Sequence, residues 1–227
     1  MMGTHQDLAW RLGQFELFSM LPLELLLRMA QSSVVHSYGA REMVFTDGDE
    51  ISSLLLVLEG DIAVFKRSSD CREQVLAHLK AGEVVSLVPL LLDEQTCHPA
   101  SGRASLPTQV VSIRLDMFKE LVERNFVFHR TLQRFLVGRL EQLSFLAASL
   151  SLQSARSRLA AFLIRQADQP GQSTGITQVE IGAEIGTVRE IVARLLRDFE
   201  QAGWLERKRQ QLVLKNRAAL EEEARRW

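Results

Sequence analysis

Hydrophobic and polar positions change their spacing twice along the 227-residue chain. Residues 7–32 have the period of a helix, most clearly in LPLELLLRMA, with Pro22 near the start of that segment. From about 34 to 115, short β-branched and apolar runs such as SLLLVLEG and VVSIRL alternate with turn signals such as DGD and EGD. Several short strands at this spacing predict a small all-β barrel or roll.

A helical period returns from Asp116 to about residue 150. The apolar seam of this helix alternates steps of four and three residues, as in a coiled coil. The seam consists of Leu132, Leu136, Arg139, Leu143, Leu146 and Leu150, with its polar break at the arginine. A helix of about 35 residues is about 50 Å long, too long for so small a domain to cover. We expect it to pair with a second copy in a two-fold dimer, the alternative being a helix packed along its own domain.

The seam is broken by the serine-rich segment SLSLQSAR, residues 149–156. Ser154 is placed to cap a further helix over about 155–168, because a serine hydroxyl can accept from the free backbone N–H groups of a first helical turn. QPGQSTG, residues 169–175, has the composition of a loop.

The next stretch, VEIGAEIGTVREIVARLL, has glycines inside a helical apolar pattern. Gly182 is expected where a second helix crosses closely, and Gly186 where the turn needs a left-handed backbone. Thr187 and Glu190 fit a capping box that starts the second helix at about Val188. The apolar positions that close the small core are Ile181, Ile185, Val192 and Leu195. Together these features predict a helix–turn–helix.

The second of these helices exposes side chains suited to reading DNA bases. Arginine can contact guanine O6 and N7 with two hydrogen bonds, and glutamate can accept from cytosine N4. Arg189, Glu190 and Arg194 lie in the first two turns, the end of a recognition helix that reaches bases. The alternative is a solvated face with an intrahelical Glu190–Arg194 ion pair.

A wing is predicted after this helix, because GWLERKRQQLVLKN, residues 203–216, has the pattern of two short strands. Basic side chains of such a wing hold phosphates, which fixes register without reading sequence. The residues expected at the DNA backbone are Thr187, Arg197, Lys208 and Arg209.

These elements predict an α+β chain in three parts. Residues 1–115 form a β-roll sensor domain with an N-terminal helix, residues 116–150 form a dimerisation helix, and residues 151–227 form a winged helix–turn–helix domain. Lys and Arg slightly outnumber Asp and Glu in the third part, whereas acids predominate in the first two. This distribution favours a DNA-binding half behind a non-binding half.

The order of a roll, a long helix and a winged helix–turn–helix resembles the CRP/FNR family of bacterial transcription regulators. The resemblance extends from LFSMLPLELL at residue 17 to LVLKNRAAL at residue 220, and Gly48 and Gly60 match turns of the family's roll. GTVREIVARLL resembles the family's recognition-helix motif, and its two arginines and its glutamate match the residues that read a TGTGA-like half-site. Val188 and Ala193 depart from the motif, where small hydroxyl or glycine residues are commoner.

The resemblance also implies an effector region, at AGEVVSLVPLLLDEQTCHPASGRA, residues 81–104. In members that bind cyclic AMP, a Gly-Glu pair holds the ribose, an Arg-Ser pair holds the phosphate, and a Thr-Ser pair on the long helix meets the base. The corresponding residues are Ser86-Leu87, His98-Pro99 and Leu143-Ser144. Besides His98, the candidate for a replacement cation is Arg139. Leucine cannot accept from a ribose, and proline offers a phosphate neither hydroxyl nor N–H. We therefore do not expect cyclic AMP to bind.

Further sensing chemistries of the family stay open. The chain has only Cys71 and Cys97, which excludes a four-cysteine iron–sulfur cluster. A haem needs only one or two axial ligands, and the residues of suitable type are Cys97, His98, His36, His78 and His129. The sequence is also compatible with tuning by a thiol, with a different small ligand, and with no ligand at all.

Composition narrows the class of protein further. Hydrophobic residues make up 46% and charged residues 24%, as in a soluble globular chain. The sequence suggests neither a membrane helix nor a secretion signal, so we expect a cytoplasmic protein. We find no Ser/His/Asp set, metal-ligand spacing or phosphate-binding loop, and so expect no catalytic or metal site. The expected partners are a near-palindromic DNA duplex, a second copy and RNA polymerase; the alternative is a ligand-binding module that acts on a protein.

Overall fold

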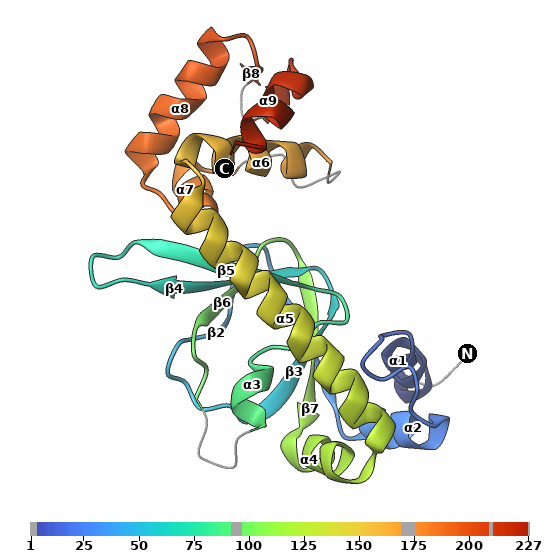
Figure 1. The fold of residues 1–227 in the computed structure, drawn as a ribbon. Coiled ribbons are helices and arrows are strands. Elements are labelled where there is room, and N and C mark those ends of the chain that lie inside the picture. The colour runs from blue at the N-terminus through green and yellow to red at the C-terminus, as the bar shows by residue number, and fades with distance from the viewer. Residues whose placement is uncertain (1–3, 92–96, 169–175, 209–210, 227) are drawn as a thin grey trace. The chain divides into compact units, whose positions relative to one another are not determined.

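A computed structural model of the chain describes residues 4–91, 97–168, 176–208 and 211–226 (Figure 1). The chain forms two compact units. The first, which we call the roll unit, comprises Met1–Phe65 and Ala77–Glu141. The second, the winged-helix unit, comprises Lys66–Leu76 and Gln142–Trp227.

The N-terminal segment forms two helices, α1 (Thr4–Gly13) and α2 (Leu23–Gln31), so the single helix predicted over 7–32 is wrong. Gly13 ends the first helix, and Pro22 is the N-cap of the second. The break has a physical reason: proline lacks the backbone N–H that a helix interior needs, and its ring disfavours a helical residue before it.

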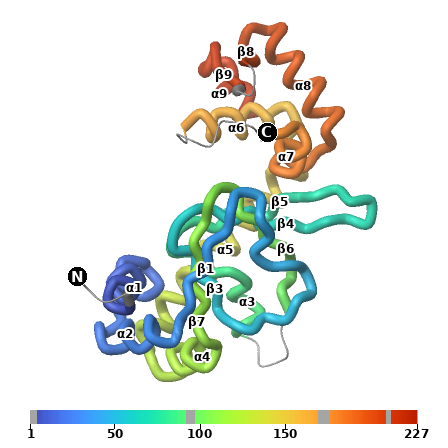
Figure 2. The backbone as a smooth tube through the Cα atoms, turned by 180° about the vertical axis from the view of Figure 1, so that it is seen from behind, coloured from blue at the N-terminus to red at the C-terminus, as the bar shows by residue number. Residues whose placement is uncertain are grey.

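The roll predicted for residues 34 to 115 is confirmed as two antiparallel sheets. One has the order β1-β7-β3 and the other the order β2-β6-β4-β5. Figure 2 shows β1, β3 and β7 lying side by side. The strands are β1 (Val34–Tyr38), β2 (Met43–Phe45), β3 (Ser53–Glu59), β4 (Asp61–Arg67), β5 (Glu73–Lys80), β6 (Ser101–Ala104) and β7 (Thr108–Arg114), with the short helix α3 (Leu87–Leu90) between β5 and β6.

Three aromatic rings pack together in the core of the roll unit. Phe128 stacks on Phe18 with a centroid distance of 5.8 Å and meets Phe118 edge-on at 6.1 Å. All three side chains are fully buried in the same core as Leu54 and Ile113. Edge-on and offset aromatic pairs add to the stabilisation from buried area. The start of the long helix is therefore part of the roll core.

The long helix predicted from Asp116 is broken at Asn125 into α4 (Leu115–Arg124) and α5 (Phe126–Leu152). Asn125 has an extended backbone, and its side-chain oxygen accepts from the backbone N–H of Phe128 at 2.9 Å. Asparagine is a preferred N-cap because it satisfies a free donor of the first turn. The 27 residues of α5 make a helix about 40 Å long.

By length and composition α5 would also suffice to cross a membrane, which the sequence analysis did not expect. One of its 18-residue windows has a mean hydropathy of 1.2, and only 6% of that window is buried. The helix nevertheless contributes Phe128 and Leu132 to the roll core, and its Arg139 pairs with Glu83. These contacts favour a helix of a globular protein with one apolar face left for a partner.

The winged-helix unit contains the helix–turn–helix, the strands of a wing and flanking helices (Figure 1). Its elements are α6 (Ala155–Ala167), α7 (Gln178–Ile185), α8 (Arg189–Gln201), β8 (Leu205–Lys208), β9 (Gln211–Leu214) and α9 (Arg217–Ala224). Ser154 caps α6 as predicted, accepting from the backbone N–H of Ser157 at 3.0 Å. The segment 169–175 lies outside the described residues. Buried side chains of α6 and α8, with Ile181 and Ile185 of α7, form one apolar core.

Gly182 gives a direct test of this packing. A Cβ there would lie 2.7 Å from the carbonyl oxygen of Thr187, inside the turn that follows. We expect Gly182→Ala to lower the free energy of unfolding of the winged-helix unit by about 1–3 kcal/mol, as for an overpacked site. Urea unfolding measures the change. Val179→Ala is the control, because Val179 is 60% exposed on the same helix. Equal stability of the two variants would contradict the close approach of the Thr187 carbonyl to Gly182.

Candidate functional site

The first helix of the helix–turn–helix, α7, begins with the capping box. The side chain of Thr177 accepts from the backbone N–H of Glu180 at 3.2 Å, and the Glu180 carboxylate accepts from the backbone N–H of Thr177 at 2.6 Å. The box predicted at Thr187 and Glu190 is wrong, since α8 has Val188 as its N-cap and no side-chain cap bond. The carboxylate of Glu190 is therefore not used in capping.

The turn between α7 and α8 matches the prediction. Gly186 has a φ of +67°, the left-handed conformation that glycine adopts without steric cost. The backbone N–H of Thr187 donates to the carbonyl of Gly182 at 2.9 Å, which satisfies one free acceptor at the end of α7. A close backbone approach at Gly182 is present, but it comes from the carbonyl of Thr187 in the turn rather than, as predicted, from the second helix. These contacts fix the direction in which α8 leaves the turn.

The recognition helix α8 has one buried face and one exposed face. Val192, Leu195, Leu196 and Phe199 are buried in the core of the unit. Arg189, Glu190 and Arg194 are exposed. Within the described ranges, these three side chains have no hydrogen-bond or ion-pair partner, so the alternative of a Glu190–Arg194 pair is not realised.

The described residues among those predicted at the DNA backbone come from α8, from the turn before it and from β8. Arg197 is exposed, and its Nε donates to the carbonyl of Ala193 at 3.3 Å. Thr187 is half-buried in the turn. Lys208 ends β8, with its ammonium 3.6 Å from the carboxylate of Glu206. The prediction for Arg209 lies outside the described residues.

Glu206 was not anticipated as a wing residue. It also binds the ammonium of Lys215 at 2.7 Å, and this hydrogen bond holds the pKa of the Glu206 carboxyl below its usual range. One acid thus faces two lysines on the exposed wing. Side chains two residues apart lie on the same face of a strand, and Glu206 and Lys208 are two apart in LERK. The sequence therefore indicates the contact with Lys208.

In the effector region, the structure brings Ser86 and His98 together. The Ser86 hydroxyl lies 2.7 Å from Nδ1 of His98, whose ring stacks on Phe45 at 4.6 Å. His98 is 7% exposed, and burial lowers the pKa of its imidazole, opposed by the charge of Asp49. The ring is therefore neutral at pH 7. A neutral, hydrogen-bonded histidine is a poor partner for a phosphate.

Two backbone features explain this arrangement. Ser86 has a φ of +49°, so it holds a left-handed conformation that glycine adopts more easily. Gly102 leaves room for the Phe45 ring, since a Cβ there would collide with the ring. A glycine inside a strand often marks such a close approach, and this signal was available in the sequence.

The other residues predicted for the pocket are dispersed. Leu87 is buried and Pro99 is exposed. Arg139 binds the carboxylate of Glu83 at 2.8 Å, an ion pair that the sequence analysis missed; burial lowers the pKa of Arg139 and the charge of Glu83 raises it. Leu143 and Ser144 are exposed on the part of α5 that belongs to the winged-helix unit.

The residues considered for haem or redox sensing do not gather into one site in the described part of the chain. Cys71 and Cys97 are exposed. The three further histidines each contact a side chain, His36 with Ser112, His78 with Asp61 and His129 with Gln133. In the part of the chain that the structure describes, no three His, Cys, Asp or Glu side chains gather as metal ligands.

The predicted dimer seam divides between two faces of α5. Leu132 is 2% exposed in the roll core, Leu150 lies against the turn at Gly186, and Leu146 is half-buried. Arg139 is ion-paired with Glu83. These four side chains are therefore wholly or partly occupied by contacts within their own chain. A second row of side chains with heptad spacing, which we call the dimer face, consists of Leu136, Leu140, Leu143 and Ala147. Leu136 and Leu143 belong to the predicted seam, whereas Leu140 and Ala147 do not.

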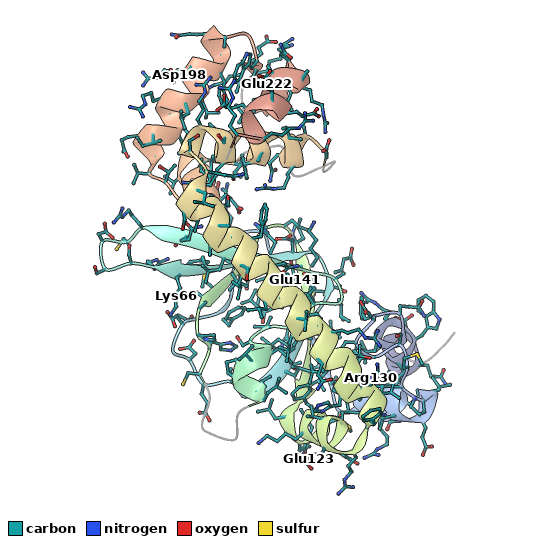
Figure 3. The ribbon with its side chains drawn as sticks, viewed as in Figure 1. Lys66, Glu123, Arg130, Glu141, Asp198 and Glu222 are labelled. Atoms are coloured by element: carbon teal, nitrogen blue, oxygen red, sulfur yellow. The ribbon has the colours of Figure 1, made fainter. Side chains whose placement is uncertain are left out.

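This dimer face is apolar and, apart from Leu136, which packs partly against the roll core, it is exposed. Leu140 is 66% exposed and Leu143 is 51% exposed. Charged side chains such as Arg130 and Glu141 also lie along α5 (Figure 3). Exposed leucines at heptad spacing are typical of a helix that pairs with another helix.

Comparison with known proteins agrees with this arrangement. Residues 35–125 match the cyclic nucleotide-binding domain, and residues 157–223 match the Crp-like helix-turn-helix domain. The chain is 26% identical over 173 residues to the cAMP-activated global transcriptional regulator CRP of Pasteurella multocida, across 73% of this chain and 82% of that protein. It is 25% identical over 186 residues to the cAMP-activated regulator Vfr of Pseudomonas aeruginosa, across 78% and 87%.

Among solved structures, the c-di-GMP responsive global regulator CLP of Xanthomonas campestris has the same fold. Its TM-score is 0.74 at 21% identity, with 85% of this chain and 99% of that chain covered. The two domain matches together cover more than half of this sequence. The relatives are transcription regulators rather than enzymes. With its roll, long helix and Crp-like helix–turn–helix, the chain belongs to the CRP/FNR family of transcription regulators.

Proposed function

We propose that the protein is a homodimeric regulator that reads a near-palindromic DNA site with α8. The observation that carries this proposal is the set of exposed side chains without partners on the first half of α8, Arg189, Glu190 and Arg194. The opposite face of the helix is fully used in the core of the unit. A helix held so firmly on one side presents the other side at a fixed angle to a groove.

In this proposal the base contacts and the phosphate contacts come from different elements. Arg189 and Arg194 donate to guanine in the major groove, and Glu190 accepts from cytosine. Arg197, Lys208 and Arg209 hold phosphates, with Thr187 at the turn. The two α8 helices of a dimer then meet half-sites about one helical turn apart, ~34 Å.

The dimer face on α5 supplies the second half of the proposal. A second copy is the occupant that gives two recognition helices related by a two-fold axis, as a palindrome requires. RNA polymerase is the protein partner that a regulator bound at a promoter contacts. A cytoplasmic location follows from these roles.

The effector is proposed to be a ligand other than cyclic AMP, or none. The two curated relatives are described as cAMP-activated, and a protein of the same fold as c-di-GMP responsive, so the fold does not determine the effector. In this chain Leu87 is buried and His98 is engaged with Ser86. Neither supplies the carboxylate or the cation that would hold a cyclic nucleotide.

Titration calorimetry tests the effector proposal. With cyclic AMP at micromolar concentrations we expect no heat of binding, because the ribose and phosphate anchors are replaced by Leu87 and Pro99. A cAMP-activated relative, titrated under the same conditions, is the positive control. A clear micromolar isotherm with this protein would overturn our interpretation of residues 81–104.

Fluorescence anisotropy tests the DNA-binding proposal. The probe is a labelled duplex with two inverted TGTGA-like half-sites centred about one helical turn apart. We expect wild type to bind it more tightly than a scrambled duplex. The triple variant Arg189→Ala, Glu190→Ala, Arg194→Ala should bind both duplexes equally while keeping its helical circular dichroism, since the three side chains are exposed. Equal discrimination by the triple variant and wild type would exclude α8 as the reading element.

A further inference from the structure

Arg158, on α6, binds backbone carbonyls from two other segments of the winged-helix unit. Its Nε donates to the carbonyl of Ile185 at 2.6 Å, and a terminal nitrogen donates to Gly186 at 3.4 Å. The other terminal nitrogen donates to Gln153 at 2.5 Å and to Ser149 at 3.3 Å. One guanidinium therefore spans the end of α5 and the helix–turn–helix turn.

The four carbonyls share a property that explains the residue type. They lie at or just past the C-terminal ends of α5 and α7, where the last carbonyls lack intrahelical partners and the helix dipoles place partial negative charge. The carbonyl of Ser149 also accepts from the backbone N–H of Gln153 at 3.1 Å. Burial lowers the pKa of Arg158, yet a guanidinium stays charged at neutral pH. Only arginine has a planar fork of donors that can reach two groups in different directions.

A second contact lies at the same junction. A Cβ at Gly186 would collide with a methyl group of Leu150, so the last turn of α5 rests directly against the turn before α8. Ser149, near this contact, is buried and hydrogen-bonded to the side chain of Gln153. The end of α5 and the start of the recognition helix are thus in contact by packing and joined by Arg158.

We propose that Arg158 is a positioning residue that sets the recognition helix at a fixed orientation to the end of α5. It touches no DNA in this account and acts through the turn at Gly186. The positioning role itself does not depend on the proposed function. Its consequence for half-site spacing rests on the proposed dimeric DNA-binding function. If α5 pairs the two copies, the distance between the two α8 helices depends on this junction, and Arg158 determines which half-site spacing is preferred.

The first test measures the junction without DNA. Spin labels are placed at Ser151 on α5 and Gln201 on α8, both exposed, in a variant with Cys71→Ser and Cys97→Ser, and the labelled chain is diluted into unlabelled protein. Double electron–electron resonance should give one narrow distance distribution for the parent. Arg158→Lys, which keeps the charge but loses the fork, should broaden it.

Arg156→Lys is the matched control on the same helix. Arg156 faces Asp198 and Glu223 and stacks over Trp204, and none of these residues belongs to α5. This variant should keep the narrow distribution. An unchanged distribution in Arg158→Lys, or equal broadening in both variants, would overturn the positioning role.

The second test measures the consequence for DNA. Wild type should prefer one spacing between inverted half-sites over duplexes with one base pair inserted or removed. We expect Arg158→Lys to lower this discrimination at least tenfold, with its preference for bases within a half-site unchanged. Uniform weakening on all spacings would reduce Arg158 to a structural residue. Loss of specific binding by wild type would instead refute the proposed function and leave the distance measurement to decide.

Discussion

Replacing Leu140 with aspartate is expected to convert the proposed dimer into a monomer. Leu140 is 66% exposed at the centre of the dimer face of α5. In a dimer the substitution buries two carboxylates that have no cationic partner on that face, which is strongly unfavourable. A cost of about 4 kcal/mol already raises a dissociation constant roughly a thousandfold.

Light scattering coupled to size exclusion measures this effect. Leu23→Asp is the matched control, because Leu23 is an equally exposed leucine, 65%, on α2. Leu143→Asp, at the neighbouring heptad position, should act in the same direction. A dimeric Leu140→Asp variant would show that α5 is not the interface.

Replacing Arg194 or Lys208 with alanine should give two different kinds of loss in DNA binding. Arg194→Ala removes a base contact, so it should cost about 1–3 kcal/mol per half-site and act twice in a dimer. Its effect should be large on the preferred duplex and small on a scrambled one. Lys208→Ala removes a phosphate contact, so it should weaken both duplexes alike.

The salt dependence of binding separates the two variants further. Each phosphate held by a cation releases counterions, so Lys208→Ala should reduce the slope of log affinity against log salt by about one unit for each phosphate that the variant no longer holds. Arg194→Ala should leave the slope nearly unchanged. Arg225→Ala serves as the control for loss of an arginine, since the side chain of Arg225, the C-cap residue of α9, is 80% exposed. Equal weakening of both duplexes by Arg194→Ala would assign that arginine to phosphate.

The helix–turn–helix could be predicted in detail because its determinants are local. Gly182 leaves room for the carbonyl of Thr187 five residues later, and Gly186 takes the left-handed conformation that the turn itself requires. The exposed face of α8 follows from its helical period. The base-reading candidates are exposed for the same reason. The capping box was misplaced because Thr-x-x-Glu occurs twice, at Thr177 and Thr187, and sequence spacing alone cannot tell which hydroxyl meets a free N–H.

The long helix was harder to predict because its leucines serve two neighbours. Leu132 packs into the roll core, whereas Leu140 stays exposed. The spacing of leucines along the chain does not distinguish a leucine of the roll core from a leucine of the dimer face. Asn125 was overlooked as a cap because the helical period continues across it. In the effector region the pairing of Ser86 with His98 depends on residues brought together by the roll, which spacing along the chain does not reveal.

The most direct test of the central claim, that α8 reads bases, is a selection from random duplexes with wild type and Arg194→Ala. We predict that wild type returns two inverted half-sites centred about one helical turn apart, ~34 Å. Arg194→Ala should return the same motif with one base pair in each half-site no longer specified. If Arg194→Ala instead returned the complete wild-type motif, with only lower affinity, the base-reading role assigned to this face of α8 would be contradicted.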